Sequence, residues 1–441
     1  MMANYAARRA ALLAQMLPGA VAILATAPEV PRNSDCDYPY RHDSYFYYLS
    51  GFTEPDSAVA LVAASATAPA RAILFCRAKN TEREIWDGFR HGPEAARASF
   101  GFDSAFPIEE LDVEMTRLLA DAPAIYYALG GSLDAQVKLW RHNVRQQARS
   151  GVTAPAIAHD INDMLDAMRL LKDTEEQNLM RRAAAISSAA HVRAMRATRP
   201  GMHEYALEAE LLYEFRRSGA QFPAYSSIVA GGGNACILHY SANNAVLQDG
   251  ELVLIDAGCE LDGYASDITR TYPVNGRFSG PQRALYELVL AAQQASLDML
   301  RPGLPHSAIH EAAVQVLAQG MLDLGLLNRQ KCGSAQDVVA DKAYMPFYMH
   351  GTSHWLGMDV HDVGAYRDTG APGKPWRALA PGMVLTVEPG IYVRPGAGVP
   401  EQFWHTGIRI EDDVLVTPQG HEVFSTAPKS VAEIEQLMSQ D

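Results

Sequence analysis

The chain has 441 residues, of which 51 are acidic and 37 are lysine or arginine, so its formal net charge is −14. At roughly 100–200 residues per domain this length predicts two or three domains, and the acidic excess opposes binding to nucleic acid or to an anionic membrane surface. No apolar stretch approaches the roughly 20 residues of a membrane-spanning helix, and scattered cysteines without a C-x-x-C pair are typical of a reduced, cytoplasmic protein.

The first predicted domain, residues 1–172, alternates between strand-like and helix-like patterns. An apolar run behind two N-terminal arginines resembles a secretory signal, but Pro18 and Gly19 interrupt it, and a helix followed by a strand is preferred. This alternation predicts a mixed α/β domain. Strands are expected over 20–27, 58–65, 70–76 and 124–130, and helices around 3–16, 107–120 and 132–149.

Two segments of this domain resist a simple assignment. Residues 32–52, RNSDCDYPYRHDSYFYYLSGF, are dense in tyrosine and charge, and they fit a packed aromatic loop as well as they fit an interface. Residues 151–160 are small and polar and are interpreted as a connection.

The second predicted domain, residues 173–441, begins with a long helix. Thr174 followed by Gln177 matches a capping box, and the alanine-rich sequence favours a helix to about Ala197. An internal echo follows, because RPGMHEYALEAELLYEF (199–215) resembles RPGLPHSAIHEAAVQVL (301–317). Arg-Pro-Gly is also a common helix stop, but both copies lie between predicted helices. We therefore interpret this domain as two related halves with a site between them.

Four carboxylates stand in apolar, strand-like surroundings. Asp256 ends an apolar run and Asp267 lies on the predicted return strand, so a hairpin would bring the two together. Within residues 382–393, a mostly apolar run leads into Glu388, and Glu411 lies among β-branched residues. Each alone fits an edge-strand charge, but several buried carboxylates repel one another unless a cation or a proton lies between them. Together they predict a metal site.

Three histidines in MHGTSHWLGMDVHDVG (349–364) are candidates to complete this site. A zinc-protease helix is excluded, because the H-E-x-x-H glutamate is missing and glycines interrupt the segment. Four carboxylates and one imidazole balance about two divalent ions, and such an oxygen-rich set suits Mn²⁺, with Co²⁺, Zn²⁺ and Fe²⁺ as alternatives. Two such ions could lower the pKa of a shared water from 15.7 to about 7, and the bridging hydroxide would attack a carbonyl carbon.

The residues Asp256, Asp267, His354, Glu388 and Glu411, in this order, resemble the five-ligand set of the pita-bread metallopeptidases. That family includes methionine aminopeptidase, Xaa-Pro dipeptidase and aminopeptidase P. The stretches EIWDGFRHGPEAA, IVAGGGNACILHY, EPGIYV and GIRIEDD extend the resemblance over nearly the whole chain and are most similar to the aminopeptidase P group. The implied architecture is α/β (α+β): an N-terminal domain for substrate cover and oligomerisation, then a pseudo-twofold pita-bread catalytic domain.

The resemblance also implies a role for each site residue. Asp256 would hold one metal, His354 and Glu388 the other, and Asp267 and Glu411 would bridge them, with Glu388 also taking the proton of the attacking water.

Substrate contacts are implied in the same way. His239 and His361 would contact the substrate around the scissile peptide and stabilise the reaction intermediate. His350 would line the proline pocket, supported by Tyr392 and Arg409. The alternative for the two loop histidines His350 and His361 is a set of ordinary hydrogen bonds, but Asp362 could orient a ring. Asp35 and Trp86 resemble residues that close the pocket, Trp86 from a neighbouring subunit, although Trp86 could instead be an ordinary buried tryptophan.

The predicted protein is therefore a cytoplasmic, homo-oligomeric di-metal aminopeptidase acting on peptides with proline in second position. A Xaa-Pro dipeptidase is the near alternative, and it would cut Ala-Pro but not Ala-Pro-Ala. A metal-independent relative such as creatinase is disfavoured by the complete ligand set, and so is a non-catalytic binding protein of this fold.

Overall fold

The computed structural model describes residues 4–439, so residue 3, in the first predicted helix, lies outside the described residues. The chain divides into two compact units, Met1–Met168 and Arg169–Asp441. The predicted boundary, between residues 172 and 173, lies a few residues further along the chain. Within the described residues, no helix is both long and apolar enough to cross a membrane.

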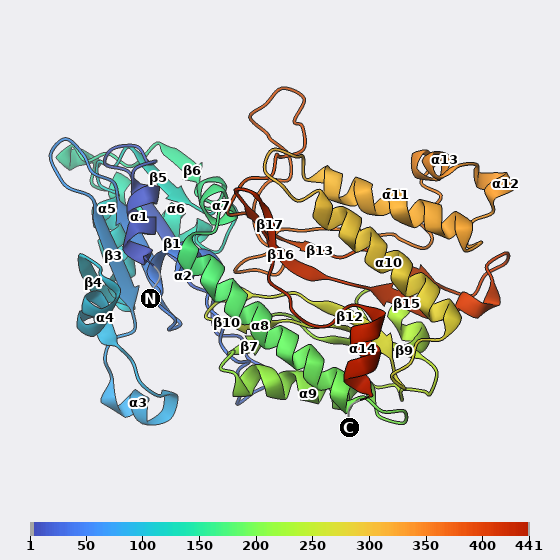
Figure 1. Ribbon diagram of the computed structural model, residues 1–441. Coiled ribbons are helices and arrows are strands. Elements are labelled where there is room, and N and C mark those ends of the chain that lie inside the picture. Colours follow the sequence, from blue (N-terminus) through green and yellow to red (C-terminus); the bar gives the residue numbers. More distant parts are fainter. Residues whose placement is uncertain (1–3, 440–441) are drawn as a thin grey trace. The chain divides into compact units, whose positions relative to one another are not determined.

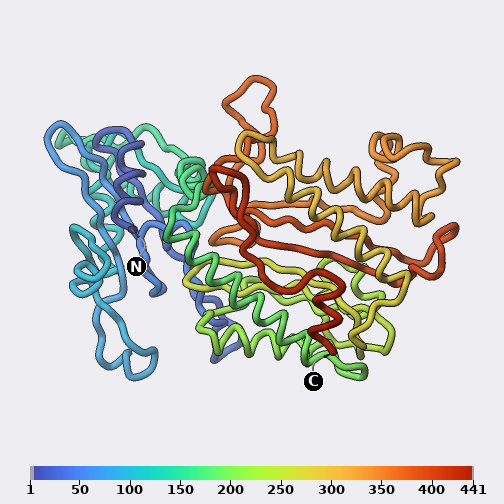
Figure 2. Tube along the Cα trace, viewed as in Figure 1, coloured from blue at the N-terminus to red at the C-terminus, as the bar shows by residue number. Residues whose placement is uncertain are grey.

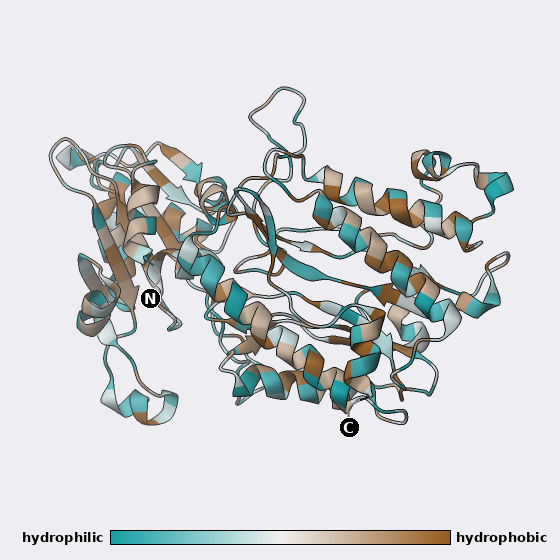
Figure 3. Cartoon of the chain, in the orientation of Figure 1, coloured by the Kyte–Doolittle hydropathy of each residue, from teal (hydrophilic) through white to brown (hydrophobic). Residues whose placement is uncertain are grey.

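The first unit is built on a six-stranded mixed sheet with the order β4-β3-β2-β1-β5-β6. Neighbours β1, β2 and β3 are antiparallel, whereas β4, β5 and β6 join in parallel. The central strands are almost wholly apolar, as expected of strands buried on both faces (Figure 3). The strands are β1 (Val21–Ala25), β2 (Ala58–Val62), β3 (Arg71–Cys76), β4 (Ser104–Pro107), β5 (Ala124–Tyr127) and β6 (Ile157–Asp160).

The helices up to residue 170 include several that were not predicted. The aromatic segment 32–52 is not wholly a loop, because Ser44–Ser50 form a helix capped by the Asp43 side chain and ended by Gly51 at φ 66°. The proposed connection 151–160 also contains β6, which pairs with β5. The helices are α1 (Tyr5–Leu13), α2 (Ser44–Ser50), α3 (Thr81–Asp87), α4 (Gly92–Phe100), α5 (Leu111–Leu118), α6 (Asp134–Arg145) and α7 (Asn162–Leu170).

The first half of the second unit runs from α8 to β12. Its long helix begins one residue earlier than predicted, because Asp173 is the N-cap and Glu176 completes the capping box. Strands β8, β9 and β12 form one antiparallel sheet, and β7, β10 and β11 form another. The elements are α8 (Thr174–Ala197), α9 (Glu204–Arg217), β7 (Phe222–Pro223), β8 (Ile228–Gly231), β9 (Leu252–Asp256), β10 (Cys259–Leu261), β11 (Tyr264–Ala265) and β12 (Thr269–Pro273).

The second half runs from α10 onward and ends with a helix that contacts α8 (Figures 1 and 2). Strands β13, β16 and β17 form one sheet, and β14 pairs with β15. The elements are α10 (Gly280–Asp298), α11 (Ser307–Asp323), α12 (Arg329–Cys332), α13 (Ala335–Ala340), β13 (Val384–Val387), β14 (Gly390–Val393), β15 (Thr406–Arg409), β16 (Asp412–Thr417), β17 (Gly420–Val423) and α14 (Val431–Met438).

Equivalent hydrogen bonds mark the two halves as related. After the first Arg-Pro-Gly, Gly201 N–H donates to Leu247 O, and Leu247 N–H donates to Met202 O. After the second, Gly303 N–H donates to Leu379 O, and Leu379 N–H donates to Leu304 O. The echo in the sequence is therefore a structural repeat. The first copy leads to β9, which ends at Asp256, and the second leads to β13, which Glu388 directly follows.

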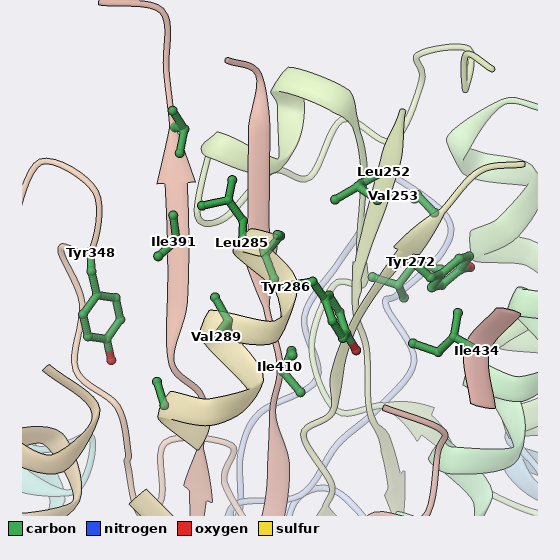
Figure 4. Close-up of a cluster of buried hydrophobic side chains, with 14 of the residues drawn as sticks. Leu252, Val253, Tyr272, Leu285, Tyr286, Val289, Tyr348, Ile391, Ile410 and Ile434 are labelled. Atoms are coloured by element: carbon green, nitrogen blue, oxygen red, sulfur yellow. The ribbon is translucent and has the colours of Figure 1, made fainter. Parts of the chain in front are cut away.

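A large hydrophobic core joins the two halves. Leu252, Val253 and Tyr272 from the first half pack in one buried cluster with Ile391 and Ile410 from the second (Figure 4). Because β9, β14 and β15 are fixed by this shared core, the polar residues at the ends of these strands occupy defined positions.

Candidate metal centre

Asp256 and Asp267 meet where β9 and β12 pair. Asp256 is the last residue of β9, opposite Thr269 of β12. Asp267 lies just before β12 rather than within a strand, and the small hairpin β10–β11 is inserted between the two aspartates. The chain crosses itself closely here, since a Cβ on Gly258 would lie 1.7 Å from Ser266 O.

His354 and Glu388 are brought together by an irregular extended segment beside β13. Glu388 N–H donates to Thr352 O at 2.8 Å, and Thr386 N–H donates to His354 O at 3.0 Å. Glu411 follows β15 and accepts a 2.6 Å hydrogen bond from the Thr269 hydroxyl. Thus segments from both halves deliver the predicted ligands to one place.

The distances between these groups suit a metal site. His354 Nε2 lies 3.4 Å from Asp267 Oδ2 and 3.7 Å from Glu388 Oε1. Single ligand atoms of Asp267, His354 and Glu411 all lie within 4.8 Å of one another. His354 Nδ1–H donates to Trp355 O at 3.0 Å, which directs Nε2 toward the carboxylates. Asp256 pairs with Arg409 at 2.6 Å.

Burial and mutual repulsion shift the pKa values of the groups at this centre. Burial raises the pKa of Glu411 well above its usual value, and neighbouring carboxylates raise it further. Burial also raises the pKa of Glu388, to about 7, although His354 and Arg409 oppose the shift. Burial lowers the pKa of His354, but its hydrogen bond to Asp267 and the charge of Glu388 outweigh this and raise it to about 9.

The Tyr225 hydroxyl tests whether this donor set fits metal ions. Its oxygen lies 2.6 Å from Asp256 Oδ1 and 2.5 Å from Asp267 Oδ1. One hydroxyl proton cannot serve two ionised carboxylates, so without a cation one of the acids must carry a proton. A divalent ion would neutralise the two carboxylates in place of that proton. The oxygen-rich donors with one imidazole fit such ions.

A cavity of about 310 Å³ opens onto the centre and is lined by all five predicted ligands together with His239, His350, His361 and Arg409. The His361 ring stacks on His354, with centroids 4.0 Å apart. Asp362, which was expected to orient a ring, instead pairs with Arg169 at 2.6 Å and Lys172 at 2.8 Å.

A hydrogen-bond chain links His350 to the centre. His350 Nδ1–H donates to Gly351 O at 2.7 Å, so Nε2 accepts from the Tyr392 hydroxyl at 2.8 Å. Arg409 in turn donates to Tyr392 at 2.9 Å. Burial and the positive charge of Arg409 lower the pKa of His350 to about 3, so this imidazole is neutral.

Two residues near the predicted ligands were missed by sequence reasoning. Tyr225 lies in an unremarkable stretch, PAYSS, and no pattern marks it. Asp413 accepts the Asp267 N–H at 3.1 Å and is itself buried. The acidic pair that follows Glu411 in the sequence was a signal for Asp413, but it does not say which way each side chain turns.

The remaining predicted residues, Asp35 and Trp86, lie in the first unit. Asp35 is exposed in the loop before α2, and Trp86 lies on α3, a helix without buried residues. The Trp86 side chain is 83% exposed, so the alternative of an ordinary buried tryptophan is wrong.

Comparisons with known proteins cover nearly the whole chain. The family model of metallopeptidase family M24 matches residues 178–418, and that of the aminopeptidase P N-terminal domain matches residues 5–126. The Xaa-Pro aminopeptidase of Escherichia coli is 44% identical over 434 residues, 98% of this chain and 96% of that protein. The Xaa-Pro aminopeptidase of Haemophilus influenzae is 43% identical, over 98% of this chain and 96% of that protein.

Solved structures agree with these sequence matches. Aminopeptidase PepP of Pseudomonas aeruginosa matches with a TM-score of 0.95 at 50% identity, covering 99% of this chain and 97% of that chain. Zinc-substituted E. coli aminopeptidase P in complex with product matches with a TM-score of 0.94 at 44% identity, covering 99% and 97%.

Proposed function

This chain belongs to metallopeptidase family M24, and from that premise we propose that it removes the N-terminal residue from peptides with proline in second position. The resemblance inferred from the sequence, and the fold it implied, are confirmed by the family and structure matches. The observation that carries the proposal is the convergence of four carboxylates and His354 on one cavity, in a chain that aligns almost end to end with Xaa-Pro aminopeptidases.

Two divalent cations are proposed to occupy the centre, with Mn²⁺ as the first candidate. We assign Asp256 to one cation, His354 and Glu388 to the other, and Asp267 and Glu411 to both. When bound, such cations polarise a carbonyl oxygen and lower the pKa of a water molecule.

The protein's own groups are assigned to move the proton and hold the peptide. Glu388, which lines the cavity beside His354, would accept the proton of the attacking water. His239 and His361 line the same cavity and would contact the substrate around the scissile peptide and stabilise the reaction intermediate. Tyr392 and Arg409 would keep His350 oriented.

Proline specificity follows from what a prolyl peptide lacks. The imide nitrogen of an Xaa-Pro bond carries no N–H, so recognition has to rely on the shape of the ring rather than on a hydrogen bond. We assign the proline side of the cavity to His350, whose neutral ring packs edge-on against Tyr348 with centroids 4.8 Å apart. This assignment rests on the resemblance and on the position of His350 in the cavity lining.

A cleavage panel tests the proposed function. Purified protein, first stripped of metal, is assayed on Ala-Pro-Ala, Ala-Pro and Ala-Ala-Ala with and without Mn²⁺. Manganese-dependent release of alanine from Ala-Pro-Ala alone supports the proposal. Efficient cleavage of Ala-Pro but not Ala-Pro-Ala would make the protein a dipeptidase, and a chain that binds no metal and cleaves nothing would be a binding protein.

The first unit is proposed to cover the substrate and to mediate assembly into a cytoplasmic homo-oligomer. Its helix α3 presents Ile85, Trp86 and the nearby Phe89 to solvent, with exposed fractions of 80, 83 and 67%. Apolar side chains gathered in this way are typical of an interface. Asp35 and Trp86 are proposed to close the substrate pocket, and Trp86 is proposed to close the pocket of a neighbouring subunit. Light scattering of the wild-type protein and of a Trp86→Glu variant tests the assembly. A charge placed at an interface residue should weaken the oligomer, so the variant should have a lower molecular mass.

A further inference from the structure

Residues 232–245 contain the loop that carries His239. It follows β8, passes through a short 3₁₀ helix at Gly232–Cys236 and returns to the core at Leu247. The His239 side chain is exposed and makes no hydrogen bond within the part of the chain that the structure describes, and nearby Ile237 is also exposed. The placement of His239 must therefore come from its neighbours in the loop.

Glu204, the first residue of α9, supplies that anchor. Its side chain is fully buried. Its two oxygens accept four hydrogen bonds: from Gly231 N at 2.8 Å, Asn234 Nδ2 at 3.0 Å, the Tyr240 hydroxyl at 2.8 Å and Ala245 N at 2.9 Å. These donors lie before, within and after the loop, and Tyr240 is the residue next to His239.

The carboxylate of Glu204 is used to its full capacity. An ionised carboxylate accepts about four hydrogen bonds, and no cationic side chain of the described residues pairs with this one. Its hydrogen-bonding capacity is therefore taken up entirely by the loop and by the strand end that precedes it. We propose that Glu204 is a positioning residue for His239 and acts through the hydroxyl of Tyr240 and the backbone of the loop.

A second carboxylate, one helical turn further along α9, strengthens the same anchor. Glu208 accepts a 3.1 Å hydrogen bond from the Asn243 side chain. Asn243 has φ 44°, and its amide also bonds Val229 N and Ser227 O, so it fixes the returning part of the loop to β8. The anchor thus has two points of attachment on one helix face.

The structural repeat provides independent support. Aligning the two Arg-Pro-Gly copies places His306 at the position of Glu204 and His310 at the position of Glu208. His306 packs on Trp355, next to His354, with ring centroids 4.8 Å apart, and His310 Nδ1 lies 2.9 Å from the Thr352 hydroxyl. In both halves, the first turn of the second helix therefore contacts the segment that carries the histidines of the cavity.

Kinetics on Ala-Pro-Ala test the inference, which rests on the proposed peptidase function. Glu204→Gln replaces two acceptor positions by a donor, and misplacement of His239 should lower kcat/KM by about 10- to 100-fold with the metal content unchanged. Glu210→Gln, a matched change on the same helix that disturbs only the half-buried ion pair with Arg193, should behave as wild type.

A double-mutant cycle separates positioning from general structural damage. If Glu204 acts through His239, adding Glu204→Gln to a His239→Ala variant should cost little further activity, because coupled residues are not additive. Fully additive losses would overturn the inference. Should Glu204→Gln fail to fold, Tyr240→Phe removes a single donor and enters the same cycle, with the same two outcomes.

Hydrogen exchange gives a readout that does not depend on activity. Amides of residues 232–245 should exchange faster in Glu204→Gln than in wild type or Glu210→Gln. If the wild-type protein cleaves no Xaa-Pro peptide, the proposed function fails, but exchange still decides whether Glu204 holds the loop. Unchanged exchange in a folded Glu204→Gln protein would overturn the inference.

Discussion

At the scale of single residues, Asp267 is the side chain on which the contacts of the centre converge. Its carboxylate meets the Tyr225 hydroxyl and His354 Nε2, and its backbone N–H is held by Asp413. Burial opposes its ionisation, yet the hydrogen bond and charge of His354, together with the hydrogen bond from Tyr225, prevail and lower the pKa of Asp267. These contacts favour the ionised form of Asp267 and direct its carboxylate into the centre.

Replacing Asp267 by asparagine removes this charge while keeping its size. Changes of residues that only support a ligand typically cost 10–100-fold in metal affinity, so we expect Asp267→Asn to lose more than about 100-fold and to abolish turnover without unfolding the protein. Metal content after dialysis, peptide cleavage and circular dichroism check this. Asp298→Asn, an exposed change on α10, is the control, and normal metal content in Asp267→Asn would remove this residue from the site.

The residues predicted from the sequence and those missed differ in how they signal their role. Asp256, Glu388 and Glu411 were found because a carboxylate next to an apolar strand is costly unless something neutralises it. Tyr225 carries no such cost, since a tyrosine is ordinary in any partly buried position. Its role arises only when the pairing of β9 with β12 brings two carboxylates to its hydroxyl.

At the scale of elements, the close crossing at Gly258 keeps β9 and the segment before β12 together. Any side chain there would collide with Ser266 O. We expect Gly258→Ala to lower the free energy of unfolding by about 1–3 kcal/mol, a typical cost of overpacking, and also to weaken metal binding by shifting Asp267. Thermal melting and calorimetric metal titration measure the two effects.

The matched control is Gly280→Ala, at the start of α10, where a Cβ meets open space. Its effect on stability should stay within about 0.5 kcal/mol. Equal melting temperatures for the two variants would contradict the steric account of Gly258.

Helix α8 carries a buried histidine that should make stability depend on pH. His191 Nε2–H donates to Ala257 O, and burial, helped by the charge of Arg270, lowers the pKa of His191 from 6.5 to about 4. Between these pH values the unfolded chain binds a proton that the folded chain does not. Folding stability therefore falls as pH drops from 6.5 to 4, by about 3 kcal/mol for this group.

Urea unfolding of the wild type and of His191→Gln between pH 7.5 and 4.5 tests this expectation. The variant should be less stable at neutral pH but should lose less stability on acidification. Some pH dependence should persist, because burial also lowers the pKa of His306 to about 4. Parallel curves for the two proteins would show that His191 does not titrate as proposed.

Element boundaries show where local sequence signals mislead. Thr174 and Gln177 fit the capping-box pattern, but Asp173 and Glu176, one residue earlier, form it. Both registers satisfy the rule, and the local sequence does not choose between them. Helix α2 was not predicted because serine and aromatic residues are weak helix formers, whereas burial of its residues in the folded unit outweighs that preference.

At the scale of the whole molecule, the metal centre joins the two halves of the second unit. Asp256 and Asp267 come from the first half, and the remaining predicted ligands come from the second. The division into halves was visible in the repeated Arg-Pro-Gly segments. The strand order of the first unit was not predictable, since β1 pairs with β5 across most of that unit, and such long-range pairing leaves no local pattern.

Removal of the metal should lower the stability of the second unit, because the metal centre joins its two halves. A cation that binds only the folded chain at 100 times its dissociation constant stabilises it by about 2.7 kcal/mol per site. Chelator-treated protein should therefore melt at a lower temperature, and added Mn²⁺ should restore the wild-type value. In Asp267→Asn the same addition should have little effect. Identical melting curves with and without chelator in the wild type would contradict a binuclear site.

The repeat has a consequence for how the molecule could be taken apart. Carboxylates from one half repel those from the other, and neither half contains a full set of predicted ligands. A backbone severed in the turn between β12 and α10 would leave two fragments whose reunion buries like charges. A bound cation would offset this repulsion and hold the two fragments together. Complementation by such fragments should therefore require the same ion as the activity of the intact enzyme.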